Sequence, residues 1–176
     1  MPHTHYALPR SQFPLADCVA TALALHRGDV ILFANQALAT LSGYSPEALA
    51  TMRFCDLFPK ESHLQICQLH GNTAEDAPPS RHEIPIVTRD GQLHWVELSV
   101  AHTRLDGERT AVCSLVDIAE RKRAESAQAQ AKQLLAQIID GDPVPTLVID
   151  ANHVVIHWNR ACEQTLGISA ADMVGT

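Results

Sequence analysis

Residues 116–124 read Val-Asp-Ile-Ala-Glu-Arg-Lys-Arg-Ala, and this stretch marks a change from a strand to a helix. Asp117 and Glu120 have the spacing of a capping box, in which the cap residue is followed three positions later by glutamate. No proline or glycine then occurs before Gly141, so the pattern predicts one long helix that begins at this point.

The predicted helix, residues 119–139, has one narrow apolar stripe. Its members step by three and four residues, as in a heptad, and they are Ala124, Ala127, Ala131, Leu134 and Ile138. Alanine buries little surface, so a solvated single helix is an alternative. Little else on the helix is apolar, and we therefore expect pairing with another helix or chain to stabilise it.

The chain before this helix alternates between strand and helix signals. Three strands are predicted at 81–88, 92–103 and 109–116, because Asp-Gly turns separate runs of alternating apolar residues. An earlier hairpin spans 19–33 around Gly28-Asp29, and short helices are predicted at 35–43, 45–50 and 60–69. The fold class is therefore α+β, in the order β-β, short helices, β-β-β.

Part of this pattern recurs after a shift of 124 residues. The identities at that single offset fall at strand cores, a helix cap and a helix end, and they are Leu23/Leu147, Val30/Val154, Asn35/Asn159, Ala37/Ala161, Gly43/Gly167 and Ser45/Ser169. The second copy stops at Thr176 without the later strands, so we expect a fragment of a longer chain. Its apolar residues Val148, Val155, Ile156 and Trp158 need a cover, for which the candidates are the first domain, an exchanged strand or an asymmetric contact with another protomer.

The composition argues against several classes of protein. With 46% hydrophobic and 19% charged residues, the 176-residue chain is typical of globular proteins. Its formal charge of −7 opposes general binding to nucleic acid or anionic lipid, and the basic run Arg121-Lys122-Arg123 lies between glutamates, as on a solvated helix face. No apolar run approaches the ~20 residues of a membrane span, so we expect a cytoplasmic protein without membrane contact.

These motifs together resemble the PAS sensory domains. The resemblance rests on Asn35-Gln-Ala-Leu38, Ser42-Gly-Tyr-Ser-Pro-Glu47, Phe58-Pro-Lys-Glu61, Thr88-Arg-Asp-Gly91, Trp95-Val-Glu-Leu-Ser-Val100 and the opening stretch 116–124. It implies a flexible leader or N-terminal cap at 1–17, a PAS domain at 18–118, a signalling helix at 119–139 and a truncated second PAS domain at 140–176. The implied fold is a five-stranded antiparallel sheet with helices over one face and an internal pocket.

The resemblance also implies a function. Such tandem domains usually belong to sensor histidine kinases or diguanylate cyclases, in which the C-terminal helix carries a signal to an output domain. The expected pocket residues are Ile66, Val96, Leu98, Val100, Cys113 and Leu115, and the expected relay residues are Asp117, Glu120, Ala124, Ala131, Leu134 and Ile138. We expect a homodimer through the N-terminal segment and the helix.

Three ligand hypotheses arise for such a pocket. Family members that bind haem b hold the iron with a histidine about 28 residues before the glycine of the Asp-Gly turn, which implies His63, with His70 as a second candidate and His82 or Arg81 on the distal side. Against haem, Ile66 stands where an aromatic residue is often found. Flavin is disfavoured because the segment around Cys55 lacks the asparagine and glutamine partners. A small apolar or acidic metabolite, or no ligand, is favoured.

The remaining hypotheses concern catalysis and the thiols. Cys67 and His70 lie one helical turn apart, as a nucleophile and base would, but no third orienting residue, phosphate loop or metal-ligand spacing accompanies them. We therefore expect a non-catalytic chain without a metal. The five cysteines contain no C-x-x-C pair and are expected to be free, with thiol sensing as an alternative to packing for Cys113. The rival to a sensor is a pure dimerisation module, which predicts an interior filled by side chains.

Overall fold

The computed structural model describes residues 8, 13–71 and 78–176 of the chain. These residues divide into two compact units, one ending at Glu120 and the other beginning at Arg121. The predictions made for residues 1–7, 9–12 and 72–77, including most of the predicted leader, lie outside the described residues.

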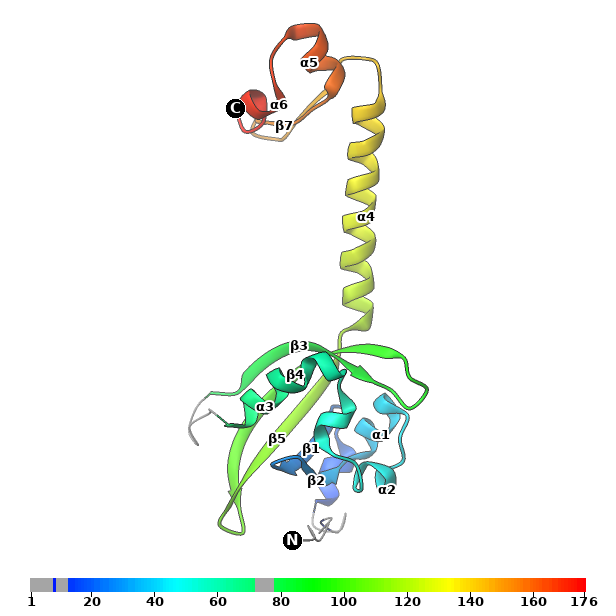
Figure 1. The fold of residues 1–176 in the computed structure, drawn as a ribbon, viewed down its shortest axis with the longest axis vertical. Coiled ribbons are helices and arrows are strands. Elements are labelled where there is room, and N and C mark those ends of the chain that lie inside the picture. The colour runs from blue at the N-terminus through cyan, green and yellow to red at the C-terminus, as the bar shows by residue number, and fades with distance from the viewer. Residues whose placement is uncertain (1–7, 9–12, 72–77) are drawn as a thin grey trace. The chain divides into compact units, whose positions relative to one another are not determined.

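The first unit is built on a five-stranded antiparallel sheet (Figure 1). Its strands are β1 (Ala22–Arg27), β2 (Val30–Ala34), β3 (Ser80–Val87), β4 (Leu93–Leu105) and β5 (Glu108–Asp117), in the spatial order β2-β1-β5-β4-β3. All neighbouring strands are antiparallel, and the turns at Gly28, Gly91 and Gly107 have the positive φ angles that glycine permits. The predicted α+β fold with a five-stranded antiparallel sheet is confirmed.

Short helices lie over one face of this sheet (Figure 1). They are α1 (Gln36–Ser42), α2 (Pro46–Leu49) and α3 (His63–Gly71), with the single-turn 3-10 helices η2 (Pro14–Cys18), η3 (Phe54–Leu57) and η4 (Lys60–Ser62). The prediction that the first strand begins at Val19 is wrong, because β1 begins at Ala22. Residues 14–18 form η2, and Asp17 Oδ1 accepts a hydrogen bond from the Gln36 N–H.

One buried asparagine ties the start of the first unit together. Asn35 caps α1 by accepting a hydrogen bond from the Leu38 N–H, and the same oxygen accepts from the Leu23 N–H. Its amide nitrogen donates to the carbonyl oxygens of Ala16 and Thr21. Since the side chain is completely buried, these four bonds replace all contact with water and fix η2, β1 and α1 to one another.

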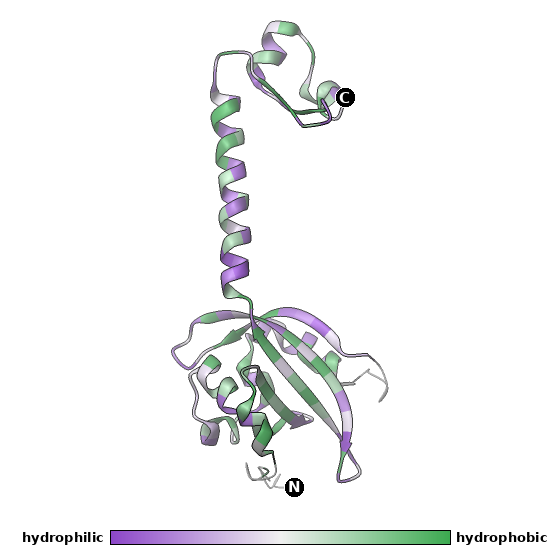
Figure 2. Ribbon diagram, turned by 180° about the vertical axis from the view of Figure 1, so that it is seen from behind, coloured by the Kyte–Doolittle hydropathy of each residue, from purple (hydrophilic) through white to green (hydrophobic). Residues whose placement is uncertain are grey.

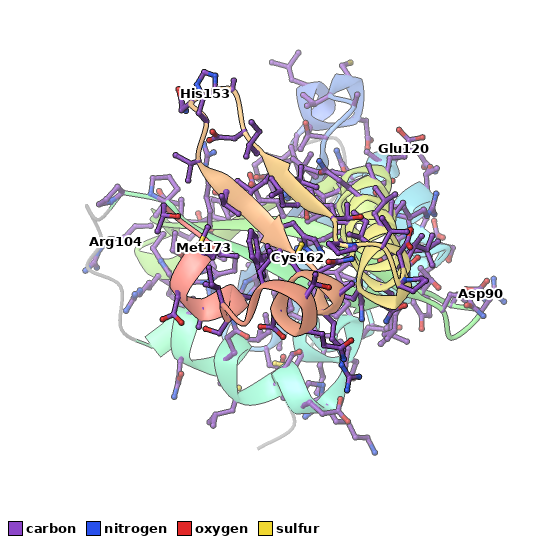
Figure 3. All side chains as sticks on the ribbon, turned by 90° about the horizontal axis from the view of Figure 1, so that it is seen from above. Asp90, Arg104, Glu120, His153, Cys162 and Met173 are labelled. Carbon is purple, nitrogen blue, oxygen red and sulfur yellow. The ribbon has the colours of Figure 1, made fainter. Side chains whose placement is uncertain are left out.

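The second unit repeats this arrangement on a smaller scale. It holds most of the long helix α4 (Ala119–Gly141), the hairpin of β6 (Leu147–Ile149) and β7 (Val155–Trp158), α5 (Arg160–Leu166) and α6 (Ala170–Met173). Figure 3 shows His153 at the tip of the hairpin and Cys162 on α5. Trp158 is buried and its indole N–H donates to Ile168 O, so the expectation that Trp158 needs an outside cover is wrong. Ile156 is half exposed.

The hydrogen bonds correct the alignment of the two copies. Asn159 accepts from the N–H groups of Thr146 and Cys162, and donates to the carbonyls of Ile139 and Val144. Each partner that precedes the hairpin loop therefore lies 123 residues, not 124, after its counterpart in the first copy. Leu147 is structurally equivalent to Ala24 and not to Leu23, because Leu147 pairs with Trp158 as Ala24 pairs with Ala34. The offset changes to 124 after the loop because the second hairpin loop is one residue longer.

No helix in the described parts of the chain combines the length and the apolar character that a membrane span requires.

Candidate functional site

The six predicted pocket residues lie together in the interior of the first unit. Val96, Leu98 and Val100 alternate along β4 and face Leu115 and Cys113 on β5, while Ile66 comes from α3. All six are at most 1% exposed and belong to one packed cluster with Leu38, Leu49, Phe54 and Leu57 from the covering helices. In this structure the six side chains touch protein neighbours, as the packed-interior alternative predicts.

A histidine and a cysteine add polar groups to this interior. His26 on β1 is 1% exposed, stacks on Phe54 with ring centroids 4.1 Å apart, and has Nδ1 2.8 Å from Gly28 O. A carbonyl only accepts, so Nδ1 carries the proton, and in the neutral ring Nε2 is left to accept from the Cys113 thiol at 3.4 Å. Burial raises the pKa of Cys113 to about 12, which keeps it a thiol.

Sequence reasoning missed His26. The signal available was a histidine that follows Ala-Leu-Ala-Leu at an inward position of the strand, and only the pairing of β1 with β5 places it beside Cys113. Because the ring is stacked and bonded on both nitrogens, it holds β1, η3 and β5 in one arrangement.

The proposed haem ligands are not brought together around an open site. His63 donates from Nε2 to Phe58 O at 3.1 Å, which is within its own segment of chain. His82 on β3 pairs with Leu98 and is half-buried, and the side chain of His70 lies outside what the structure describes. Arg81 is exposed. With the interior packed as above, the residues as they lie do not fit a porphyrin.

The described residues also contain surface grooves. One is lined by Thr40, Leu41 and Gly43 of α1 and its C-cap, together with Thr88, Arg89 and Asp90 before the β3–β4 turn. None of the six predicted pocket residues lines it. No group of three or more metal-ligating side chains was found within the described residues.

The strand-to-helix junction is the best-defined polar site. Asp117 ends β5, and its carboxylate accepts a hydrogen bond from the Ala119 N–H, at the first residue of α4. The same oxygen lies 2.9 Å from His94 Nε2 at the start of β4, an ion pair when the imidazole is protonated. The Ile118 N–H donates to Trp95 O, and Ile118 is buried. The base of α4 is thus fixed to β4 by backbone and side chain.

The other predicted relay residues lie along α4. Glu120, Ala124 and Ala131 are exposed, as are Leu134 and Ile138, at 58% and 60%. Figure 2 shows hydrophilic residues over the first turns of α4 and more hydrophobic ones toward its C-terminal end. Glu125 pairs with Arg121 and Lys122, which confirms that the basic run is part of a solvated helix face.

Comparison with known proteins identifies the architecture. A PAS domain family model matches residues 17–120, more than half of the chain, and a PAS fold model matches residues 133–176. No curated protein sequence matches the chain.

Solved PAS structures have the same fold. The PAS domain of a Colwellia psychrerythraea protein has a TM-score of 0.55 at 21% identity, covering 63% of this chain and 97% of its own. A PAS domain of an HTR-like protein from Haloarcula marismortui has a TM-score of 0.51 at 19% identity, covering 59% and 86%. A sensory box histidine kinase/response regulator from Burkholderia thailandensis has a TM-score of 0.53 at 16% identity, covering 73% and 99%. The chain belongs to the PAS domain family, whose members are typical of sensory signal-transduction proteins.

Proposed function

We propose that this chain is a non-catalytic sensory and dimerisation module that works in the cytoplasm. It passes a change in the interior of the first PAS domain through α4 to an output domain of the histidine kinase or diguanylate cyclase type. The observation that carries the proposal is the direct continuation of β5 into α4. Cys113 and Leu115 lie in the core, and α4 begins two residues after the strand end at Asp117.

A core packed to this density does not deform smoothly, so a change in its contents shifts whole strands. β5 lies between β1 and β4, and its inward residue Leu115 lies four residues before the start of α4. A shift of β5 reaches Asp117, and from there the Ala119 N–H and the His94 ring.

Two matched core variants test this route. Leu115→Val perturbs β5 and Ile84→Val perturbs β3, and both residues are at most 2% exposed. Amide hydrogen exchange followed by mass spectrometry should show faster exchange over residues 118–124 in Leu115→Val than in Ile84→Val, after correction for the stability of each variant. Equal exchange over 118–124 in the two variants would contradict a route through β5.

We further propose that α4 pairs with α4 of a second copy of the chain. Support comes from the exposed stripe containing Ala131, Leu134 and Ile138, whose two large side chains are 58% and 60% exposed. Ala131 and Ala129 are both exposed and lie on opposite sides of the helix, since two residues span about 200°. Ala131→Glu should weaken the dimer in analytical ultracentrifugation, and Ala129→Glu should not. An equal effect of both variants, or of neither, would refute pairing through this stripe.

A PAS module that only mediates protein interaction is the second candidate. The observation that favours it is the packed cluster around Ile66, Leu98 and Leu115. The two functions differ in the hydrogen-exchange experiment above, because a module without a relay has no reason to couple Leu115 to residues 118–124 more strongly than Ile84.

A further inference from the structure

Two cysteines of the first unit lie side by side although they are twelve positions apart in the sequence. Cys55 is on η3 and Cys67 is on α3, and their Sγ atoms are 4.0 Å apart. A disulfide bond is about 2.05 Å long, so the two sulfurs are in contact and need to approach by about 2 Å to bond. The sequence, without a C-x-x-C pair, gave no sign of this.

The surroundings of the two thiols differ. Cys55 is buried, and its backbone N–H donates to Asp29 Oδ1, while the Phe54 N–H donates to Asp29 O. These bonds hold η3 on the β1–β2 turn. Cys67 follows Ile66, which is anchored in the core, but Cys67 itself is exposed. One thiol of the pair is therefore held in place and the other is open to reagents.

We propose that Cys55 and Cys67 are an oxidation site, at which a peroxide converts the two thiols into a reversible disulfide that links η3 to α3. This site goes beyond the proposed sensory function, to which it offers a chemical input, and the disulfide is testable whether or not that function holds.

The order of the steps follows from exposure. The Cys67 thiolate attacks one oxygen of the peroxide, the O–O bond breaks, and the leaving hydroxide takes a proton and departs as water. The Cys55 sulfur then attacks the sulfur of the Cys67 sulfenic acid, the S–O bond breaks, and the Cys55 proton leaves with the hydroxyl group as a second water. Two sulfurs give up two electrons, and one hydrogen peroxide becomes two waters.

The acidity of Cys55 agrees with this assignment. Burial, followed by the hydrogen bond and charge of Asp29, raises the pKa of Cys55. Cys55 is thus a poor first nucleophile and suits the resolving position. Closing the gap moves η3 against α3, and these elements carry Phe54, which stacks on His26, and Ile66 of the core. A disulfide here therefore acts on the same interior that we propose as the sensor.

Peptide mapping of the whole chain tests the proposal. The reduced chain is treated with hydrogen peroxide, alkylated and digested with trypsin, which cuts after Arg53, Lys60 and Arg81 and so separates the two cysteines. We expect peptides 54–60 and 61–81 to be joined, with a mass two hydrogens below their sum, and to be released by dithiothreitol. The same product should form in Cys18→Ser, which removes an exposed thiol outside the pair.

Single variants identify the attacking thiol. In Cys55→Ala the sulfenic acid on Cys67 has no resolving partner, so a dimedone adduct should accumulate on peptide 61–81. In Cys67→Ser, peptide 54–60 should carry no dimedone adduct, with circular dichroism confirming the fold of both variants. The proposal is overturned if wild-type Cys67 stops at the sulfenic acid, if it bonds to Cys18 or to another chain, or if Cys55 is the thiol that dimedone traps.

Discussion

Replacing Asn35 by alanine should lower the free energy of unfolding of the first unit by about 3–4 kcal/mol. The magnitude follows from four hydrogen bonds that the completely buried amide makes, to the N–H groups of Leu23 and Leu38 and to the carbonyls of Ala16 and Thr21. Each backbone group that loses such a partner lowers the free energy of unfolding by about 1 kcal/mol when water does not fully replace the lost hydrogen bond. Since small domains are stable by about 5–15 kcal/mol, the variant should still fold but should unfold at a much lower urea concentration than the wild type.

The assay uses the distribution of the two tryptophans. Trp95 belongs to the first unit and Trp158 to the second. In a Trp158→Phe background, fluorescence during urea unfolding reports the first unit alone, and the difference between the two unfolding free energies gives the cost of Asn35→Ala.

A single-bond cap provides the scale for this measurement. Ser45 accepts one hydrogen bond, from the Ala48 N–H, at an exposed helix start. Ser45→Ala should therefore cost about 1 kcal/mol in the same background. If Asn35→Ala costs no more than Ser45→Ala, the four bonds do not act together and the reasoning fails.

Three further predictions concern a turn, a carboxylate and a thiol. Gly43→Ala should destabilise the first unit by about 1 kcal/mol in urea unfolding, because Gly43 has a φ of +75° and an added Cβ would lie 3.5 Å from that of Arg89. Hydrogen bonds from the N–H groups of Val154 and Asn152 lower the pKa of Asp150. Its contribution to stability is therefore present above its ordinary pKa of 3.8 and is lost as the pH falls through the pKa of the folded state. In Asp150→Asn, whose amide oxygen still accepts both bonds, Trp158 fluorescence should show a smaller loss of stability in acid. Iodoacetamide should leave Cys113 unlabelled in the folded chain, because burial raises its pKa to about 12, and mass spectrometry should find it labelled only in denaturant.

Alternation and turn residues were sufficient to predict the sheet. The inward positions of β4 were correct because Val96, Leu98 and Val100 alternate with Glu97 and Ser99, and the Asp-Gly turns set the hairpin ends. The start of β1 was placed too early because nothing local distinguishes residues 19–21 from a strand. η2 is held instead by bonds to Asn35 and Gln36, which lie well beyond it in the chain.

The candidate site was predictable only where neighbours in sequence are also neighbours in space. Asp117 was identified from its local motif, but its contact with His94 depends on the pairing of β4 with β5. The same limit applies to α3, which was predicted as a helix at 60–69 without its contacts. Ile66 is buried, whereas the next residue, Cys67, is exposed and its sulfur lies against that of Cys55 on a separate helix.

The repeated asparagine explains how α4 belongs to both PAS copies. In the first copy Asn35 donates to Ala16 O in η2, and in the second copy Asn159 donates to Ile139 O in the last turns of α4. At the offset of 123, residue 16 corresponds to residue 139, so the end of α4 occupies the position in the second copy that η2 has in the first. A helix that begins at the Asp117 junction of one PAS copy therefore ends as the N-terminal element of the next. A change that reaches α4 through β5 would arrive at an element that Asn159 bonds directly to the hairpin and helix α5 of the second copy.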